Sequence, residues 1–134
     1  MIESAAEFNR LRTSEVPAEY DRAAREMASL HTWMMVIEQY PDMRFWVAQN
    51  KTVPIEVLEV LSRDLEPRVR HMVAMKRKLP ERLQAALARD ENDSVRRAVA
   101  WNPKATRAVL KFLADDFEPE IREKAKDRLA KGKW

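Results

Sequence analysis

The stretch that decides the fold is Pro67-Arg-Val-Arg-His-Met-Val-Ala-Met-Lys-Arg-Lys-Leu-Pro80, because similar stretches lie 26 residues before and after it. Pro41-Asp-Met-Arg-Phe-Trp-Val-Ala-Gln-Asn precedes it, and Asp93-Ser-Val-Arg-Arg-Ala-Val-Ala-Trp-Asn follows it. A shorter version, Pro119-Glu-Ile-Arg-Glu-Lys-Ala-Lys, stands one further period along the chain. Self-similarity at a fixed period of this length is typical of repeat proteins.

At several positions of the repeat, here called columns, the residues of successive copies share the same chemical character. Three columns are apolar, and two are charged, with each arginine six positions after the acid. The apolar columns are Met43, Val69, Val95 and Ile121; Val47, Val73, Val99 and Ala125; and Met35, Leu61, Leu87 and Leu113. The arginine column is Arg44, Arg70, Arg96 and Arg122, and the acidic column is Glu38, Asp64, Asp90 and Asp116.

The composition of the 134 residues favours helices and excludes several kinds of site. Helix-forming Ala, Leu, Glu, Arg and Lys dominate, and Gly132 is the sole glycine. A Gly-rich phosphate-binding loop is therefore excluded, and the absence of cysteine excludes disulfides and thiolate metal sites. No window reaches 18 apolar residues, and the first residues lack the basic and apolar regions of a signal peptide. We therefore expect a cytoplasmic, all-α protein with no membrane contact.

Each repeat is interpreted as two short helices, A and B. In one copy the pattern predicts helix A over about residues 54–63, with Val57, Val60 and Leu61 inward, and helix B over about residues 67–76. Such a pair cannot bury its own apolar face, so stacked neighbours are needed to form a core. The sequence predicts a right-handed α-solenoid of about four repeats over residues 31–134, with residues 1–30 as an N-terminal helical cap.

The residues then suggest a family. The run from Val95 to Asp116, followed by Glu118-Pro-Glu-Ile-Arg, resembles the leucine-rich repeat variant pattern, and the acid-to-arginine gap of six resembles HEAT repeats. The period is longer than that family's usual one, and its Asn-Pro step occurs here only at Asn102-Pro103. Some members of the family carry a Cys-ligated iron–sulfur cluster, which a chain without cysteine cannot hold. The resemblance implies a helical scaffold and no particular chemistry.

The arginine column has two interpretations. Four guanidinium groups in a row form a possible anion-binding surface. The regular spacing instead favours a structural ladder in which these arginines pair with the acidic column, because guanidinium and carboxylate form bidentate pairs.

The turns between helices differ in charge. The A-to-B turns are rich in Asp and Glu, whereas the B-to-A turns carry Lys51, Lys76, Arg77, Lys78 and Lys104. These bases are the predicted contacts of the alternative function, binding of nucleic acid by a HEAT-like protein. Complementarity with the helix dipoles explains the same pattern and is favoured. Residues 1–42 carry a net charge of −4 and residues 43–134 a net charge of +7.

The outward face of the B helices carries the predicted protein-binding site. A spacing of 100° per residue places large side chains on either side of a flat column formed by Ala48, Ala74 and Ala100. Trp, Arg, Met and Phe are enriched at interface centres. The alternative is that the columns are misphased and these side chains pack between helices; Trp46 is assigned to the core. The predicted protein-binding residues are Phe45, His71, Met75, Arg97 and Trp101.

Catalysis has little support in the sequence. His31 falls in an apolar column and is expected near the core, and His71 is expected to be exposed without a His or Cys partner in its repeat. No nucleophile, base and orienting group recur together. We therefore expect a non-enzymatic scaffold without metal or cofactor, which binds another protein as an adaptor, an inhibitor or an immunity-type antidote.

Overall fold

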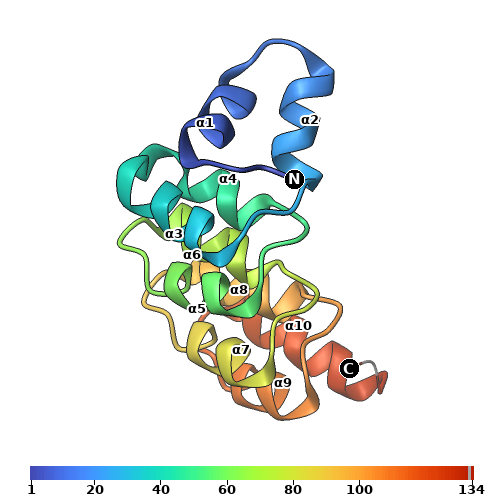
Figure 1. Ribbon diagram of the computed structural model, residues 1–134. Helices are drawn as coiled ribbons and strands as arrows, with labels where there is room; N and C mark the ends of the chain where they lie inside the picture. The colour runs from blue at the N-terminus through green and yellow to red at the C-terminus, as the bar shows by residue number, and fades with distance from the viewer. Residues whose placement is uncertain (133) are drawn as a thin grey trace. The chain divides into compact units, whose positions relative to one another are not determined.

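The computed structural model describes residues 1–132 and 134 and is all-helical over them (Figure 1). Its only extended pairing in the described residues is an isolated bridge between Ile2 and Ala28. In this part of the chain, no helix is long and apolar enough to cross a membrane. The helices are α1 Ala5–Thr13, α2 Pro17–Arg25, α3 Leu30–Gln39, the 3-10 helix η1 Pro41–Met43, α4 Arg44–Gln49, α5 Ile55–Leu61, α6 Pro67–Ala74, α7 Glu81–Leu87, α8 Asp93–Trp101, α9 Arg107–Leu113 and α10 Pro119–Ala130.

The first compact unit, Met1–Leu61, contains α1 to α5. The Ser4 hydroxyl caps α1 by accepting from the backbone N–H of Glu7, and Pro17 stands in the first turn of α2, where no helical N–H is needed. Phe8 and Trp33 are fully buried and meet edge to face, with ring centroids 5.3 Å apart. This pair forms the centre of the core that joins α1 to α3.

The second unit, Ser62–Trp134, contains α6 to α10. The second helices α6, α8 and α10 pack in series, and the first helices α7 and α9 lie beside each other along them (Figure 1). Leucines from the first helices meet valines and isoleucine from the second helices in the core. In this unit the buried members of the predicted apolar columns are Val69, Val73, Leu87, Val95, Val99, Leu113, Ile121 and Ala125.

Hydrogen bonds in the second unit recur at the period of 26 seen in the sequence. Asp64, Asp90 and Asp116 each accept, through a carboxylate oxygen, the backbone N–H of the residue two positions on. Arg70, Arg96 and Arg122 each donate to the backbone carbonyl of the acid six residues earlier. Residues 26 positions apart therefore make the same local hydrogen bonds.

A second recurring contact joins the ends of successive second helices. Asn102 is buried and donates to the carbonyl oxygens of Ala74 and Lys76, both at 2.9 Å. Arg128, 26 residues later, donates to the carbonyls of Ala100 and Asn102 at 2.9 and 2.7 Å. We call these contacts the carbonyl clasps. They satisfy carbonyl groups that a helix C-terminus leaves without partners.

Several predictions about side-chain direction were wrong. Ala48, Ala74 and Ala100 are fully buried, so the alanine column is a packing surface and not an exposed floor. A small side chain at this position allows close approach of the neighbouring helices. His31, expected near the core, is exposed, and Trp46, assigned to the core, is half-buried.

Of the three residues expected to point inward in one first helix, Val57 and Leu61 are buried as predicted, and Val60 is not. In α5, Leu58 is buried and Val60 is 38% exposed, whereas Val60 was expected inward. The predicted boundary at residue 30 between cap and repeats stays a prediction.

Candidate protein-binding site

A surface hollow of about 360 Å³ opens on the side of the second unit formed by α6, α8 and α10. It lies where the last turns of α6 and α8 meet the first turn of α10. Apolar groups form most of its wall. The lining residues are His71, Met75, Arg97, Ala98, Trp101, Asn102, Pro103 and Glu120.

Trp101 and Met75 are the large apolar side chains of this hollow. Trp101 ends α8 with 43% of its surface exposed, and Met75 follows α6 with 52% exposed. The ammonium group of Lys124 lies 5.1 Å from the centre of the Trp101 ring, within cation–π range. Met75 and Trp101 each lie between residues whose backbone carbonyls accept hydrogen bonds in the carbonyl clasps. These hydrogen bonds fix the backbone position of both residues.

His71 is held by a single defined hydrogen bond. Its Nδ1 lies 3.0 Å from the carbonyl oxygen of Ser94. Because a carbonyl oxygen only accepts, Nδ1 is the donor in this hydrogen bond. This contact orients the half-buried imidazole at the wall of the hollow.

Arg97 lies between two carboxylates. Its Nε is 3.5 Å from Glu120 of α10, and its Nη2 is 3.8 Å from Asp93 of the same helix. The Nε atom is buried, and it makes no hydrogen bond among the residues that the structure describes. Arg97 and Glu120, both of which line the hollow, therefore offset each other's charge there.

The structure brings together four of the five residues predicted for protein binding. His71, Met75, Arg97 and Trp101 line one hollow. Phe45 lies in the other unit, where it meets Trp46 edge to face with ring centroids 4.8 Å apart. The guanidinium of Arg12 lies 3.5 Å above the Trp46 ring. The half-buried Trp46 is thus covered by a cation and not enclosed by the core.

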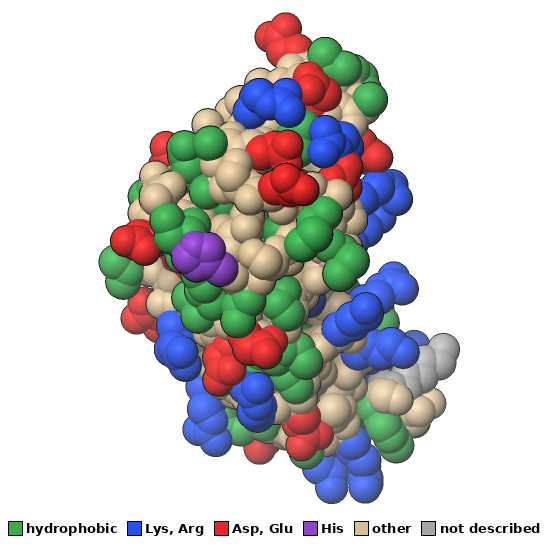
Figure 2. All heavy atoms as spheres, viewed as in Figure 1, with side chains coloured by type: hydrophobic (Ala, Val, Ile, Leu, Met, Phe, Trp, Pro, Cys, Tyr) green, Lys and Arg blue, Asp and Glu red, His purple; other side chains and the backbone are tan. Residues whose placement is uncertain are grey.

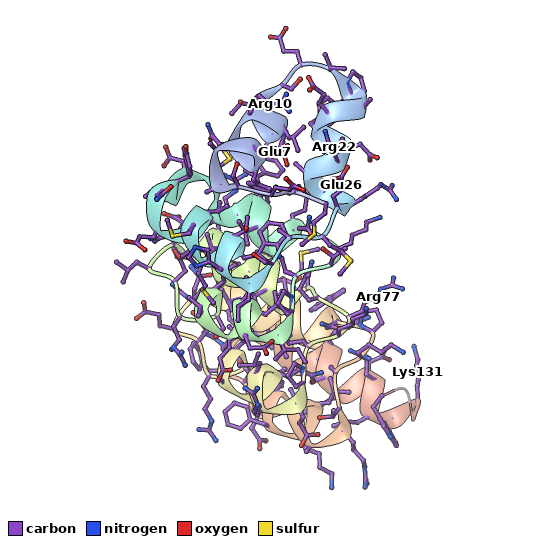
Figure 3. The ribbon with its side chains drawn as sticks, in the orientation of Figure 1. Glu7, Arg10, Arg22, Glu26, Arg77 and Lys131 are labelled. Carbon is purple, nitrogen blue, oxygen red and sulfur yellow. The ribbon has the colours of Figure 1, made fainter. Side chains whose placement is uncertain are left out.

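The basic residues of the alternative site also divide between the units. Lys51 belongs to the first unit, and the other four stand on two turns of the second. Gln84 joins these turns, because its amide donates to the carbonyls of Leu79 and Lys104 at 3.0 Å each. Figure 3 shows Arg77 and Lys131 extending from the same side of this unit, and Figure 2 shows many Lys and Arg side chains over it. The residues on these two turns are Lys76, Arg77, Lys78 and Lys104.

The arginine and acidic columns form a ladder of ion pairs. The paired residues lie 20 positions apart along the chain, and not six positions apart as the sequence predicted. The guanidinium of Arg70 contacts both carboxylate oxygens of Asp90, at 2.7 and 3.1 Å, and Arg96 contacts Asp116 in the same way, at 2.9 and 3.5 Å. Arg70 and Arg96 therefore each bind the carboxylate 20 residues later and the carbonyl six residues earlier. The Asp90 carboxylate raises the pKa of Arg70 through its hydrogen bond. These guanidinium groups are engaged within the fold.

The residues at the ends of the two charged columns have different surroundings. Arg44 donates to the carbonyl of Ile37 at 2.9 Å in the first unit, and Glu38 there is exposed. Arg122, the last arginine of the column, lies 3.5 Å from Glu123.

Sequence reasoning missed Glu120 and Lys124, which come from α10. Both contacts follow one offset along the chain. Arg97 contacts Glu120, Trp101 contacts Lys124 and His71 contacts Ser94, and in each pair the second residue lies 23 positions after the first. That offset is one period minus one helical turn. The signal was thus present in the sequence, provided that adjacent second helices were aligned in this register.

The described residues contain no group of three or more His, Cys, Asp or Glu side chains placed to hold a metal ion. The hollow combines an apolar wall, an oriented imidazole and a neutralised ion pair. This arrangement suits binding of an apolar group.

No family model, curated protein or solved structure matches this chain.

Proposed function

We propose that the chain is a right-handed α-solenoid of about four 26-residue repeats, similar to leucine-rich repeat variant and HEAT proteins, with residues 1–30 as a cap. The recurring aspartate turns, the arginine contacts and the carbonyl clasps support equivalence of successive repeats. The fold presents its second helices side by side, which is the surface that such scaffolds offer to a ligand.

The function proposed for this scaffold is non-enzymatic protein binding in the cytoplasm, as an adaptor, an inhibitor or an immunity-type antidote. The observation that carries it is the apolar hollow at α6, α8 and α10, with Trp101 and Met75 exposed at fixed positions. A large side chain of a partner inserted there would bury both residues. Aromatic anchors in such hollows supply much of the free energy of binding in protein complexes.

An affinity-capture experiment with a matched control tests this function. Phe112 of α9 is 43% exposed, as Trp101 is, and carries the Arg89 guanidinium 4.4 Å from its ring centre. The tagged wild type, Trp101→Ala and Phe112→Ala are compared in nuclease-treated lysate of cells that express the chain. The proposal expects a stoichiometric protein that Trp101→Ala loses and Phe112→Ala retains. Equal capture by all three proteins would contradict the site.

The second candidate function is nucleic-acid binding by the basic turns. The observation that favours it is the hydrogen bonding of Gln84, which holds the turn before α7 against the turn before α9 and so gathers their bases. Phosphate contacts release counterions, so this binding would weaken steeply as salt rises. Titration of a DNA duplex and of tRNA at low and moderate salt tests it, with Lys78→Glu/Lys104→Glu as the variant expected to lose binding.

A further inference from the structure

A second hollow adjoins the first and differs from it in charge. It has a volume of about 480 Å³ and shares Trp101 and Pro103 with the first hollow as a common wall. Its remaining lining comes from α10 and the residues that follow it. These are Lys124, Asp127, Arg128, Lys131 and Trp134.

The formal charges of the two hollows are unequal. Arg97 and Glu120 cancel in the first hollow, whereas three bases face one acid in the second. Asp127 is engaged by Lys131, whose Nζ lies 3.1 Å from its carboxylate. The second hollow therefore carries a formal charge of +2 beside a neutral, apolar neighbour.

Arg128 contributes one of these positive charges from a buried, hydrogen-bonded position. Its side chain is nine-tenths buried, and its guanidinium donates to the carbonyls of Ala100, Asn102 and Pro103. No described carboxylate lies within ion-pair distance of it. Burial lowers the pKa of Arg128, which shows that the site disfavours the charge that this side chain brings. An anionic group nearby would offset this cost.

Lys124 and Trp101 link the two hollows. The ammonium group lies over the indole ring, so an anion that binds Lys124 would sit at the edge of the Trp101 wall. The ring itself would contact an apolar group in the first hollow. One short segment could therefore satisfy both hollows.

Building on the proposed function, we infer that the partner docks through an acidic peptide segment in which a large apolar side chain lies close to Asp or Glu residues. The apolar side chain occupies the first hollow against Trp101 and Met75. The carboxylates face Lys124, Lys131 and Arg128 in the second hollow. Charge complementarity therefore selects the partner, while the apolar anchor supplies affinity.

The test is a selection of random 12-residue peptides displayed on phage against the full chain, followed by affinity measurement on the enriched peptides. Wild type, Trp101→Ala and Lys124→Glu/Lys131→Glu are used, together with Arg63→Glu/Lys111→Glu. The last variant changes the net charge equally at two exposed bases outside both hollows. A single-stranded oligothymidine probe is titrated in parallel.

The inference expects enriched peptides with a net negative charge and one large apolar residue. Reversal of Lys124 and Lys131 should weaken their binding by about tenfold, because two exposed attractive contacts with the peptide carboxylates become repulsive, and the control reversal should not weaken it. Enriched peptides with an apolar anchor but no acidic bias would overturn this inference and leave the proposed function standing. No enrichment over Trp101→Ala would overturn both, as would tighter binding of oligothymidine at the same two lysines.

Discussion

Asn102 is a buried residue whose side chain joins two successive second helices. Its amide donates to two carbonyls and accepts the backbone N–H of Lys104 at 2.9 Å. An alanine here leaves three backbone groups without this partner, one buried and two partly buried, and a fully buried group of this kind costs about 1–3 kcal/mol. We expect Asn102→Ala to lower the free energy of unfolding by about 2–4 kcal/mol, since local relaxation restores part of the loss.

Urea unfolding at neutral pH measures this effect, with Asn92→Ala as the control. Asn92 caps α8 by accepting from the N–H of Ser94, and loss of such a cap costs about 1 kcal/mol. Equal losses in the two variants would contradict the importance of the carbonyl clasp.

The Arg70–Asp90 pair should also be essential for stability. The side chains are only 10% and 9% exposed, so an unpaired guanidinium could not be solvated by water. Breaking a buried pair costs about 3–5 kcal/mol, and we expect about 3 kcal/mol for Asp90→Asn because the amide retains some contacts. In Asp93→Asn, where Arg97 is 3.8 Å away and the acid is half exposed, the loss should stay below about 1 kcal/mol. Thermal unfolding of both variants distinguishes these values.

For the helices, the sequence predicted the fold class and the position along the chain better than the direction of individual side chains. The helix-forming composition predicted the all-α fold, and helix B was expected over residues 67–76 where α6 runs from Pro67 to Ala74. The direction of single columns was less certain because most of these helices have six to ten residues. Over one or two turns, an apolar face cannot be distinguished from its neighbour by spacing alone, so the alanine column was placed outside instead of between helices.

The carbonyl clasps could not be predicted from conserved chemistry along the chain. Their column holds Asn50, Lys76, Asn102 and Arg128, which differ in shape and charge. Asn50 donates to Ala23 and Glu26 in the first unit, as Asn102 and Arg128 do to carbonyls in the second. Different side chains thus meet the same need, which is a donor for the carbonyls at the end of a helix.

The helix pair α1 and α2 should be sensitive to acid. Glu26 accepts hydrogen bonds from Arg22 and pairs with the amino group of Met1 at 3.1 Å, and these contacts lower the pKa of Glu26 from the usual 4.5 to about 2. Figure 3 shows Arg22 on α2, Glu26 directly after it, and Glu7 and Arg10 on α1. A lowered pKa contributes stability that is present above pH 4.5 and is lost as the pH falls towards 2.

We therefore expect the urea midpoint of the wild type to fall between pH 4.5 and 2, and Glu26→Gln to flatten this part of the profile. At neutral pH, Glu26→Gln should be less stable than wild type. Glu15→Gln, which changes an exposed acid, serves as the control. A profile of Glu26→Gln as steep as that of the wild type would show that other groups cause the acid sensitivity.

At the scale of the whole molecule, charge is distributed unevenly. Residues 1–61 contain 6 bases and 10 acids, whereas residues 62–134 contain 19 bases and 12 acids. A positive field accelerates association with an acidic ligand, and salt screens it. For a peptide selected on the two hollows, we expect the association rate constant to fall by about three- to tenfold between about 0.05 and about 0.5 M salt.

The dissociation rate constant should change little over the same range, because the apolar anchor holds the bound peptide. Surface plasmon resonance gives both constants. A salt effect confined to dissociation would show that the charges act within the bound complex and do not steer the encounter.

We propose that a partner docks on α6, α8 and α10 at the hollow of Trp101 and Met75. Site-specific photo-crosslinking tests it most directly, with benzoylphenylalanine introduced at Met75 and, as the control, at Phe112 of α9. Both positions are exposed, at 52% and 43%. We expect irradiation of cells that express the chain to give one discrete crosslinked protein from position 75, lost with Trp101→Ala, and none from position 112. Crosslinks from position 112 alone would contradict the claim.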